Sequence, residues 1–117
     1  HAITDAILGA CGMGDIGQMF SDQSKKFKNI RSTILLQKVI NQIKSKEYSI
    51  NNIDINIIIQ TPKIKKYKNK MVKNIAKLCE ISEKQINIKG KTTEKLGVVG
   101  KEKAIACEVI CSIIKYA

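Results

Sequence analysis

Three stretches of the chain place apolar residues three and four positions apart, which is the spacing of one helix face. These stretches cover 1–13, 32–46 and 63–79. Thr61 and Pro62 stand just before the third stretch, where a threonine suits the N-cap and a proline suits the first helical position. The sequence therefore predicts three helices, the third beginning directly after Pro62.

Three other stretches favour strands. Apolar and polar residues alternate over 53–59, a shorter run covers 85–89, and β-branched residues alternate over 104–114, where a helix is the alternative. Polar loops are expected at 14–31 and 90–101. The pattern predicts the α/β class, specifically an α+β two-layer sandwich with a mixed sheet and helices on one face. No linker or repeat divides it, so 1–117 is expected to form one domain.

The chain is strongly basic, with a formal net charge of +11 from 21 Lys and Arg against 10 Asp and Glu. Such a charge favours polyanionic partners, but the lysines alternate with Asn and Ile, so part of it is expected to be a solvated face. Aromatic residues make up only 4% of the chain and tryptophan is absent, so few side chains are available to stack on nucleic-acid bases. No apolar run approaches the roughly 20 residues of a membrane span. Neither a nucleic-acid partner nor a membrane is expected.

The cysteine pattern points to a reducing compartment. Cys11, Cys79, Cys107 and Cys111 sit among aliphatic residues, and none belongs to a C-x-x-C pair. We expect small buried thiols rather than disulfides or metal ligands, although an even number does not exclude bridges.

Several short motifs suggest chemistry, each with an ordinary alternative. The Gly12–Gly17 segment matches G-x-G-x-x-G, but a predicted helix precedes it where the dinucleotide fingerprint needs a strand, so these glycines are expected to end the helix. His1 and Asp5 lie one helical turn apart, which suits a metal ligand or simply a solvated face. The Lys91–Gly97 and Gln60–Lys63 segments offer hydroxyl, carboxylate and ammonium groups, as a phosphate cradle or as plain loops and caps.

Taken together, these segments resemble a known family. The matching stretches are, in order, His1–Ala10, Gly14–Gly17 with Phe20 and Asp22, Asn52–Asp54, Gln60–Lys63, Thr92–Gly97 and Ile105–Glu108. They resemble the 2-C-methyl-D-erythritol 2,4-cyclodiphosphate synthases of the non-mevalonate isoprenoid pathway. The resemblance implies a homotrimer around a threefold axis with active sites between subunits. It also implies conversion of 4-diphosphocytidyl-2-C-methyl-D-erythritol 2-phosphate to the cyclodiphosphate with release of CMP.

The resemblance also implies residue roles. His1 resembles one ligand of a catalytic Zn²⁺, Glu94 the ligand of a Mg²⁺ or Mn²⁺ ion, and Thr92 the catalytic residue that stabilises the transition state. Lys101 stands where the family lines the threefold axis, which can hold an isoprenoid diphosphate. The full set of expected substrate-binding residues is Asp15, Ile16, Gly17, Phe20, Asp22, Gln60, Pro62, Lys63, Thr92, Thr93, Glu94 and Lys101.

The chain departs from the family pattern in its metal ligands. The family's Asp-x-His pair and a further loop histidine have no counterpart, because His1 is the only histidine. Lys91 stands where a threonine is common in the family, and Lys101 stands where an arginine is usual. Lysine keeps the charge but cannot form the two parallel hydrogen bonds that a guanidinium makes to a phosphate. We therefore expect an N-terminal segment to be missing and this chain alone to be inactive.

A non-catalytic relic, a structural trimer and a basic nucleic-acid-binding module remain the alternatives. The expected location is a plastid-type organelle (apicoplast) stroma, with bacterial cytoplasm as the alternative.

Overall fold

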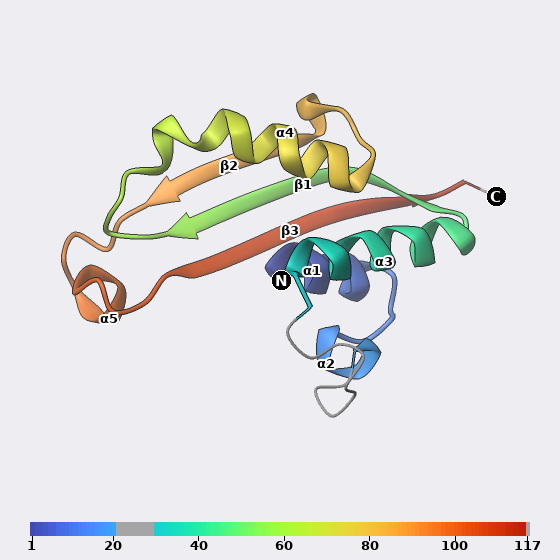
Figure 1. Cartoon of the computed structure of the whole chain (residues 1–117), viewed down its shortest axis with the longest axis horizontal. Coiled ribbons are helices and arrows are strands. Elements are labelled where there is room, and N and C mark those ends of the chain that lie inside the picture. Colours follow the sequence, from blue (N-terminus) through green and yellow to red (C-terminus); the bar gives the residue numbers. More distant parts are fainter. Residues whose placement is uncertain (21–29, 117) are drawn as a thin grey trace.

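A mixed sheet with strand order β2-β1-β3 organises the chain (Figure 1). The structure is a computed structural model that describes residues 1–20 and 30–116. β1 (Tyr48–Ile58) pairs in parallel with β2 (Ile86–Lys91) and antiparallel with β3 (Ala106–Lys115). The predicted mixed sheet is therefore confirmed, and the helical alternative for 104–114 is wrong.

Three helices cover one face of this sheet, as predicted (Figure 1). α1 (Ala2–Ala10) packs on β3, α3 (Ser32–Ser45) on β1, and α4 (Lys68–Cys79) on β2. Each is amphipathic and turns its apolar side inward, which is the usual source of helix stability inside a domain. The described parts of the connections contain four short elements: α2 (Ile16–Met19), η1 (Ile64–Lys66), η2 (Glu83–Gln85) and α5 (Gly97–Gly100).

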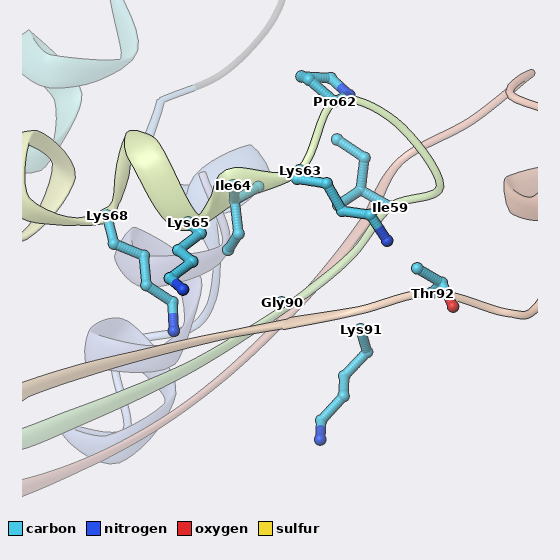
Figure 2. Close-up of a pocket in the computed structure, with 9 residues that line it drawn as sticks. All are labelled: Ile59, Pro62, Lys63, Ile64, Lys65, Lys68, Gly90, Lys91 and Thr92. Carbon is cyan, nitrogen blue, oxygen red and sulfur yellow. The ribbon is translucent and has the colours of Figure 1, made fainter.

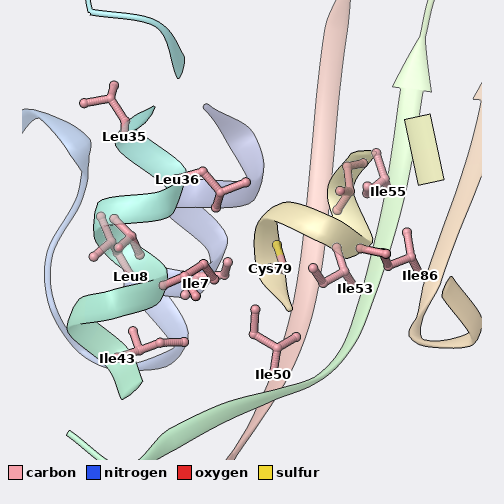
Figure 3. Close-up of a cluster of buried hydrophobic side chains, with 14 of the residues drawn as sticks. Ile7, Leu8, Leu35, Leu36, Ile43, Ile50, Ile53, Ile55, Cys79 and Ile86 are labelled. Atoms are coloured by element: carbon pink, nitrogen blue, oxygen red, sulfur yellow. The ribbon is translucent and has the colours of Figure 1, made fainter. Parts of the chain in front are cut away.

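The core lies between the helices and the sheet (Figure 3). Ile53 of β1 and Ile7 and Leu8 of α1 are fully buried. Burying one such side chain stabilises the fold by about 1.5–3 kcal/mol. Leu36 and Ile43 bring α3 into the same cluster, so side chains from distant parts of the sequence share one core.

The opposite face of the sheet is open in the single chain. The carboxylate of Asp54 accepts hydrogen bonds there from Lys89 Nζ at 2.9 Å and from Asn87 Nδ2 at 3.2 Å. Ile110, the β3 partner of Asp54, is 77% exposed. A large apolar side chain is therefore left uncovered beside an ion pair.

The expected start of the third helix is wrong. Thr61 does not cap a helix at Pro62; the bond between them is cis, and α4 begins only at Lys68. Lys63 is extended, and Ile64 packs directly over Gly90 of β2. Because lysines crowd this segment and Ile64 is held by the sheet, the helix begins only at Lys68, three residues before the apolar stripe that starts at Met71.

β1 begins five residues earlier than the expected strand at 53. A register shift between Ile50 and Asn52 breaks the alternation, so Ile50 and Ile53 both face the core although three positions separate them. A bulge of this kind hides the strand from a search for period two. The helices α2 and α5, each of four residues, were missed because they are too short to show a helical period.

The cysteines are free, and their burial differs from the expectation. Cys79 is buried, and burial raises the pKa of its thiol to about 12. Cys11 and Cys111 are half-buried, and burial raises the pKa of each. Cys107 is exposed, so the expectation of four buried thiols is wrong for this residue. It lies near the start of the edge strand β3.

Candidate functional site

The parallel strands β1 and β2 end side by side. Ile58 is the partner of Lys91, and the next residue, Ile59, donates its N–H to the Lys91 carbonyl at 2.8 Å. Ligands of open sheets tend to bind outside the carboxyl ends of parallel strands. The Gln60 and Thr92 segments, which sequence reasoning had singled out separately, therefore leave the sheet at one place.

Hydrogen bonds join and shape these two segments. The Lys95 N–H donates to Gln60 Oε1 at 3.0 Å, and the Glu94 N–H donates to Thr92 Oγ1 at 3.2 Å. The Thr93 hydroxyl donates to the Leu96 carbonyl at 2.6 Å. Glu94 and Lys95 both adopt the left-handed region, with φ of 53° and 68°. The turn is thus held by side chains, with the Glu94 carboxylate exposed to solvent.

A cavity of about 280 Å³ lies beside this junction (Figure 2). Its walls are partly apolar, from Ile59, Pro62 and Ile64, and Thr92 adds a hydroxyl. Gly90 forms part of the lining opposite Ile64, and a Cβ there would stand 2.7 Å from Ile64 Cγ1. The absence of a side chain at Gly90 therefore lets the connecting segment approach β2.

The rest of the cavity wall is cationic. Lys63, Lys65 and Lys68 supply its ammonium groups, and no acidic residue is among the lining side chains. Lys91 also belongs to the lining, but its side chain points away from the other three lysines (Figure 2). A concave surface with one sign of charge attracts ions of the opposite sign and raises their local concentration. Apolar walls with a hydroxyl and several ammonium groups suit a ligand that carries both a ring and phosphate groups.

The N-terminal candidates form a second group, around α1 and α2. The Asp5 carboxylate accepts the Ile16 N–H at 2.8 Å, and the Asp15 carboxylate caps α2 by accepting the Gln18 N–H at 2.8 Å. The Ile16 N–H, expected to meet substrate, is therefore paired within the chain. Gly17 is exposed beside them.

Two further expectations concern the segment after α2. Phe20 was expected to contact substrate. Its side chain is only 5% exposed and belongs to the core, so it is not available at the surface in this structure. Asp22 lies outside the described residues.

The structure brings together some of the expected site residues and leaves others apart. Pro62, Lys63 and Thr92 line one cavity. Gln60 lines a neighbouring hollow with Lys103, and Lys101 follows α5 without lining either. The group around the α1–α2 junction lies away from them, below the middle of β3 (Figure 1).

A metal site is not complete in the described residues. His1 is exposed at the start of α1, and no cluster of three His, Cys, Asp or Glu in 1–20 and 30–116 could hold an ion. Asp5 shares its face but already holds the Ile16 amide. A catalytic zinc needs about three protein ligands, so the residues present do not fit a zinc ion by themselves.

Sequence reasoning missed two lysines beyond Lys63, which are Lys65 and Lys68, and the glycine before Lys91. Lys65, Lys68 and Gly90 all line the cavity. The signal in the sequence is the density of lysine between 63 and 70, which is equally typical of a solvated face. Only the approach of this segment to β2 shows that Lys65 and Lys68 border a cavity.

Comparison with known proteins gives a consistent result. The model of the YgbB family matches residues 1–114. A protein from Pelagibacter ubique named bifunctional enzyme IspD/IspF is 72% identical over 98% of this chain, which spans 31% of that protein. A 2-C-methyl-D-erythritol 2,4-cyclodiphosphate synthase from Francisella tularensis subsp. novicida is 48% identical over 98% of this chain and 72% of its own length.

Solved structures share the fold. The IspF of Plasmodium falciparum in complex with CDP is 44% identical, with a TM-score of 0.88 over 100% of this chain and 70% of that one. The bifunctional IspDF of Campylobacter jejuni is 40% identical, with a TM-score of 0.93 over 99% of this chain and 31% of that one. None of the described helices has the length and apolar character needed to cross a bilayer.

Proposed function

Since this chain belongs to the YgbB family of 2-C-methyl-D-erythritol 2,4-cyclodiphosphate synthases, we propose that it carries most of a site that forms this cyclic diphosphate. The proposed substrate is 4-diphosphocytidyl-2-C-methyl-D-erythritol 2-phosphate, and the second product is CMP. The observation that carries the proposal is the junction of the Gln60 and Thr92 segments at one lysine-lined cavity.

The nucleotide is assigned to this cavity. A 44% identical relative has been solved as a CDP complex, and here the apolar walls suit a pyrimidine ring while Lys63 and Thr92 suit phosphate oxygens. We propose that Gln60, Pro62 and Lys63 hold the cytidine end. Thr92, Thr93 and Glu94 would then lie beside the diphosphate, at the exposed turn that follows β2.

The reaction is an intramolecular phosphoryl transfer. An oxygen of the 2-phosphate attacks the β-phosphorus, the bond between that phosphorus and the bridging oxygen breaks, and CMP leaves with that oxygen. The chain's task is to fold the substrate back on itself and to neutralise crowded negative charge. The Thr92 hydroxyl is proposed to donate to a phosphoryl oxygen in the transition state. Asp15, Ile16 and Gly17 are proposed to contact the methylerythritol portion, together with Asp22 from the adjoining segment. The buried Phe20 would support this segment from the core rather than contact the substrate.

Divalent metal ions are proposed to assist. When bound, they would supply charge neutralisation at the phosphates. His1 would be one ligand of a zinc ion, and the exposed Glu94 would be a ligand of a magnesium or manganese ion. No step here depends on a zinc ion held by these residues alone.

A homotrimer is proposed as the working assembly. Ile105, Ile110, Leu96 and Val98 are between 61% and 77% exposed, on β3 and the α5 connection. An exposed apolar surface of this kind suits a contact with other copies of the chain. A trimer would also bring Lys101 of each copy toward a shared axis, where it would provide charge for an isoprenoid diphosphate.

The bacterial alternative for location is now favoured. The 72% identical relative is from Pelagibacter ubique, and the lysine and isoleucine bias suits a bacterium as well as a plastid. We therefore propose bacterial cytoplasm in place of an apicoplast stroma. A non-catalytic trimer is the second candidate function, because the described residues hold no complete metal cluster.

The test compares this chain with the full natural protein. Calorimetric titration with CDP in the presence of Mg²⁺ should show binding to both, and CMP release should appear only with the longer protein. His1→Ala in the longer protein should lower zinc content and turnover together. Full turnover by residues 1–117 alone would refute the metal assignment, and CDP binding without turnover by the full protein would favour the non-catalytic trimer.

A further inference from the structure

The lysine-lined cavity has two cationic ends. Lys63 lies on the side of Thr92, whereas Lys65 and Lys68 extend from η1 and α4 toward β2 on the other side of Ile64 (Figure 2). The nucleotide phosphates assigned to the Thr92 turn would occupy only the first end. The Lys65–Lys68 end is left with two ammonium groups and no assigned ligand.

These two lysines have no counter-charge in the described chain. No acidic residue occurs between Asp54 and Glu80. The ion pairs formed within 1–20 and 30–116 involve Lys44 and Lys89 only. Lys66, the remaining lysine of η1, lies over the ring of Tyr67 at 5.1 Å and does not line the cavity.

The position of these lysines in the fold is electrostatically unfavourable. Lys65 and Lys68 stand at the beginning of α4, and no side chain caps that end of the helix. Cations are favourable near the C-terminus of a helix and unfavourable near its N-terminus. Local violations of this kind are expected at functional sites, where a ligand compensates for them. An anion in the cavity would relieve both the lysine repulsion and the helix-end charge.

We propose that Lys65 and Lys68 form a second anion subsite in this cavity, which binds a small phosphate-class ion beside the nucleotide. The inference rests on the proposed function only for the nucleotide at the Lys63–Thr92 end. Ile64 separates the two ends, and its side chain packs against Gly90 on the β2 side. The second subsite thus makes the cavity selective for ligands or ligand pairs with negative charge at both ends.

The test titrates inorganic phosphate into the full natural protein saturated with CDP, at constant ionic strength. Phosphate should bind, and a Lys65→Gln, Lys68→Gln double variant should bind it about tenfold or more weakly, because both ammonium groups that would pair with the anion are lost. Glutamine keeps much of the stem that lines the cavity. Lys73→Gln with Lys77→Gln on the same helix, outside the cavity lining, is the matched control and should leave phosphate binding unchanged.

The outcomes separate this inference from the proposed function. Equal phosphate binding by wild type and the double variant overturns the subsite while leaving CDP binding intact. Absence of phosphate binding to the CDP-saturated wild type, with weaker CDP binding in the double variant, assigns the two lysines to the nucleotide itself and also overturns it. If CDP fails to bind but phosphate binds the free protein and depends on Lys65 and Lys68, the subsite stands and the proposed function fails.

Discussion

The backbone N–H of Lys95 donates a 3.0 Å hydrogen bond to Oε1 of Gln60, which fixes the turn after β2 against the segment after β1. Gln60→Ala should release this turn and weaken CDP binding severalfold. The free energy of unfolding should fall by only about 0.5–1.5 kcal/mol, as for one hydrogen bond. Amide hydrogen exchange at Lys95 and CDP titration measure the two effects. Gln42→Ala, on the exposed side of α3, is the control and should change neither.

Gly90→Ala should close the cavity more than it destabilises the fold. The new methyl group would stand 2.7 Å and 2.9 Å from Ile64 Cγ1 and Cδ1, so the end of the isoleucine side chain must move. Since a side chain moves more readily than backbone, we expect a loss of stability of about 1 kcal/mol, at the low end of the usual cost of overpacking, together with a clear loss of CDP affinity. Urea denaturation and calorimetry provide the comparison. Unchanged affinity would show that the nucleotide does not use this wall.

Gly100→Ala should destabilise the connection that carries α5. A Cβ at this buried position would meet the backbone of Lys95, with Lys95 Cα at 2.8 Å, and Thr93 Oγ1 at 2.8 Å. Backbone cannot yield as a side chain can, so we expect a cost of about 1–3 kcal/mol. Gly9→Ala offers a matched contrast, because a Cβ at this exposed helix position meets nothing within 4 Å. Gly9→Ala should stabilise α1 by roughly 0.5–1 kcal/mol. Thermal unfolding should therefore show a lower melting temperature for Gly100→Ala and a higher one for Gly9→Ala.

The ion pair on the open face should make stability depend on acid pH. Hydrogen bonds from Lys89 and then Asn87 hold the pKa of the Asp54 carboxyl below its ordinary value. A depressed pKa means that the native state favours the ionised form, so the stabilisation is present above the ordinary value and is lost as pH falls through the lowered pKa. Lys89→Gln should return the Asp54 pKa toward its ordinary value, as carboxyl titration by NMR can show. A titration that is unchanged in Lys89→Gln would contradict the pairing.

The positions of the main helices and strands followed from the sequence, because side-chain periodicity depends on local geometry. The stripes over 1–13 and 32–46 and the alternation over 53–59 each describe a surface that must be buried, whatever lies against it. The predicted starts of α4 and β1 were wrong, because long-range contacts determine where these two elements begin. Ile64 packs on Gly90, so α4 starts late, and a bulge after Ile50 extends β1 beyond its visible alternation.

For the site, the sequence determined which residues carry chemistry, and the fold decided which of them meet. The hydroxyls, carboxylate and ammonium groups of 60–63 and 91–95 were recognisable from their order alone, as was the resemblance that links them. That Lys65 and Lys68 border the same cavity, while His1 and Glu94 do not share a metal cluster within the described residues, depends on strand pairing and on Ile64 reaching Gly90. The physical reason is that a local pattern fixes which side of an element is apolar, whereas contacts between elements depend on register and packing across the whole sheet.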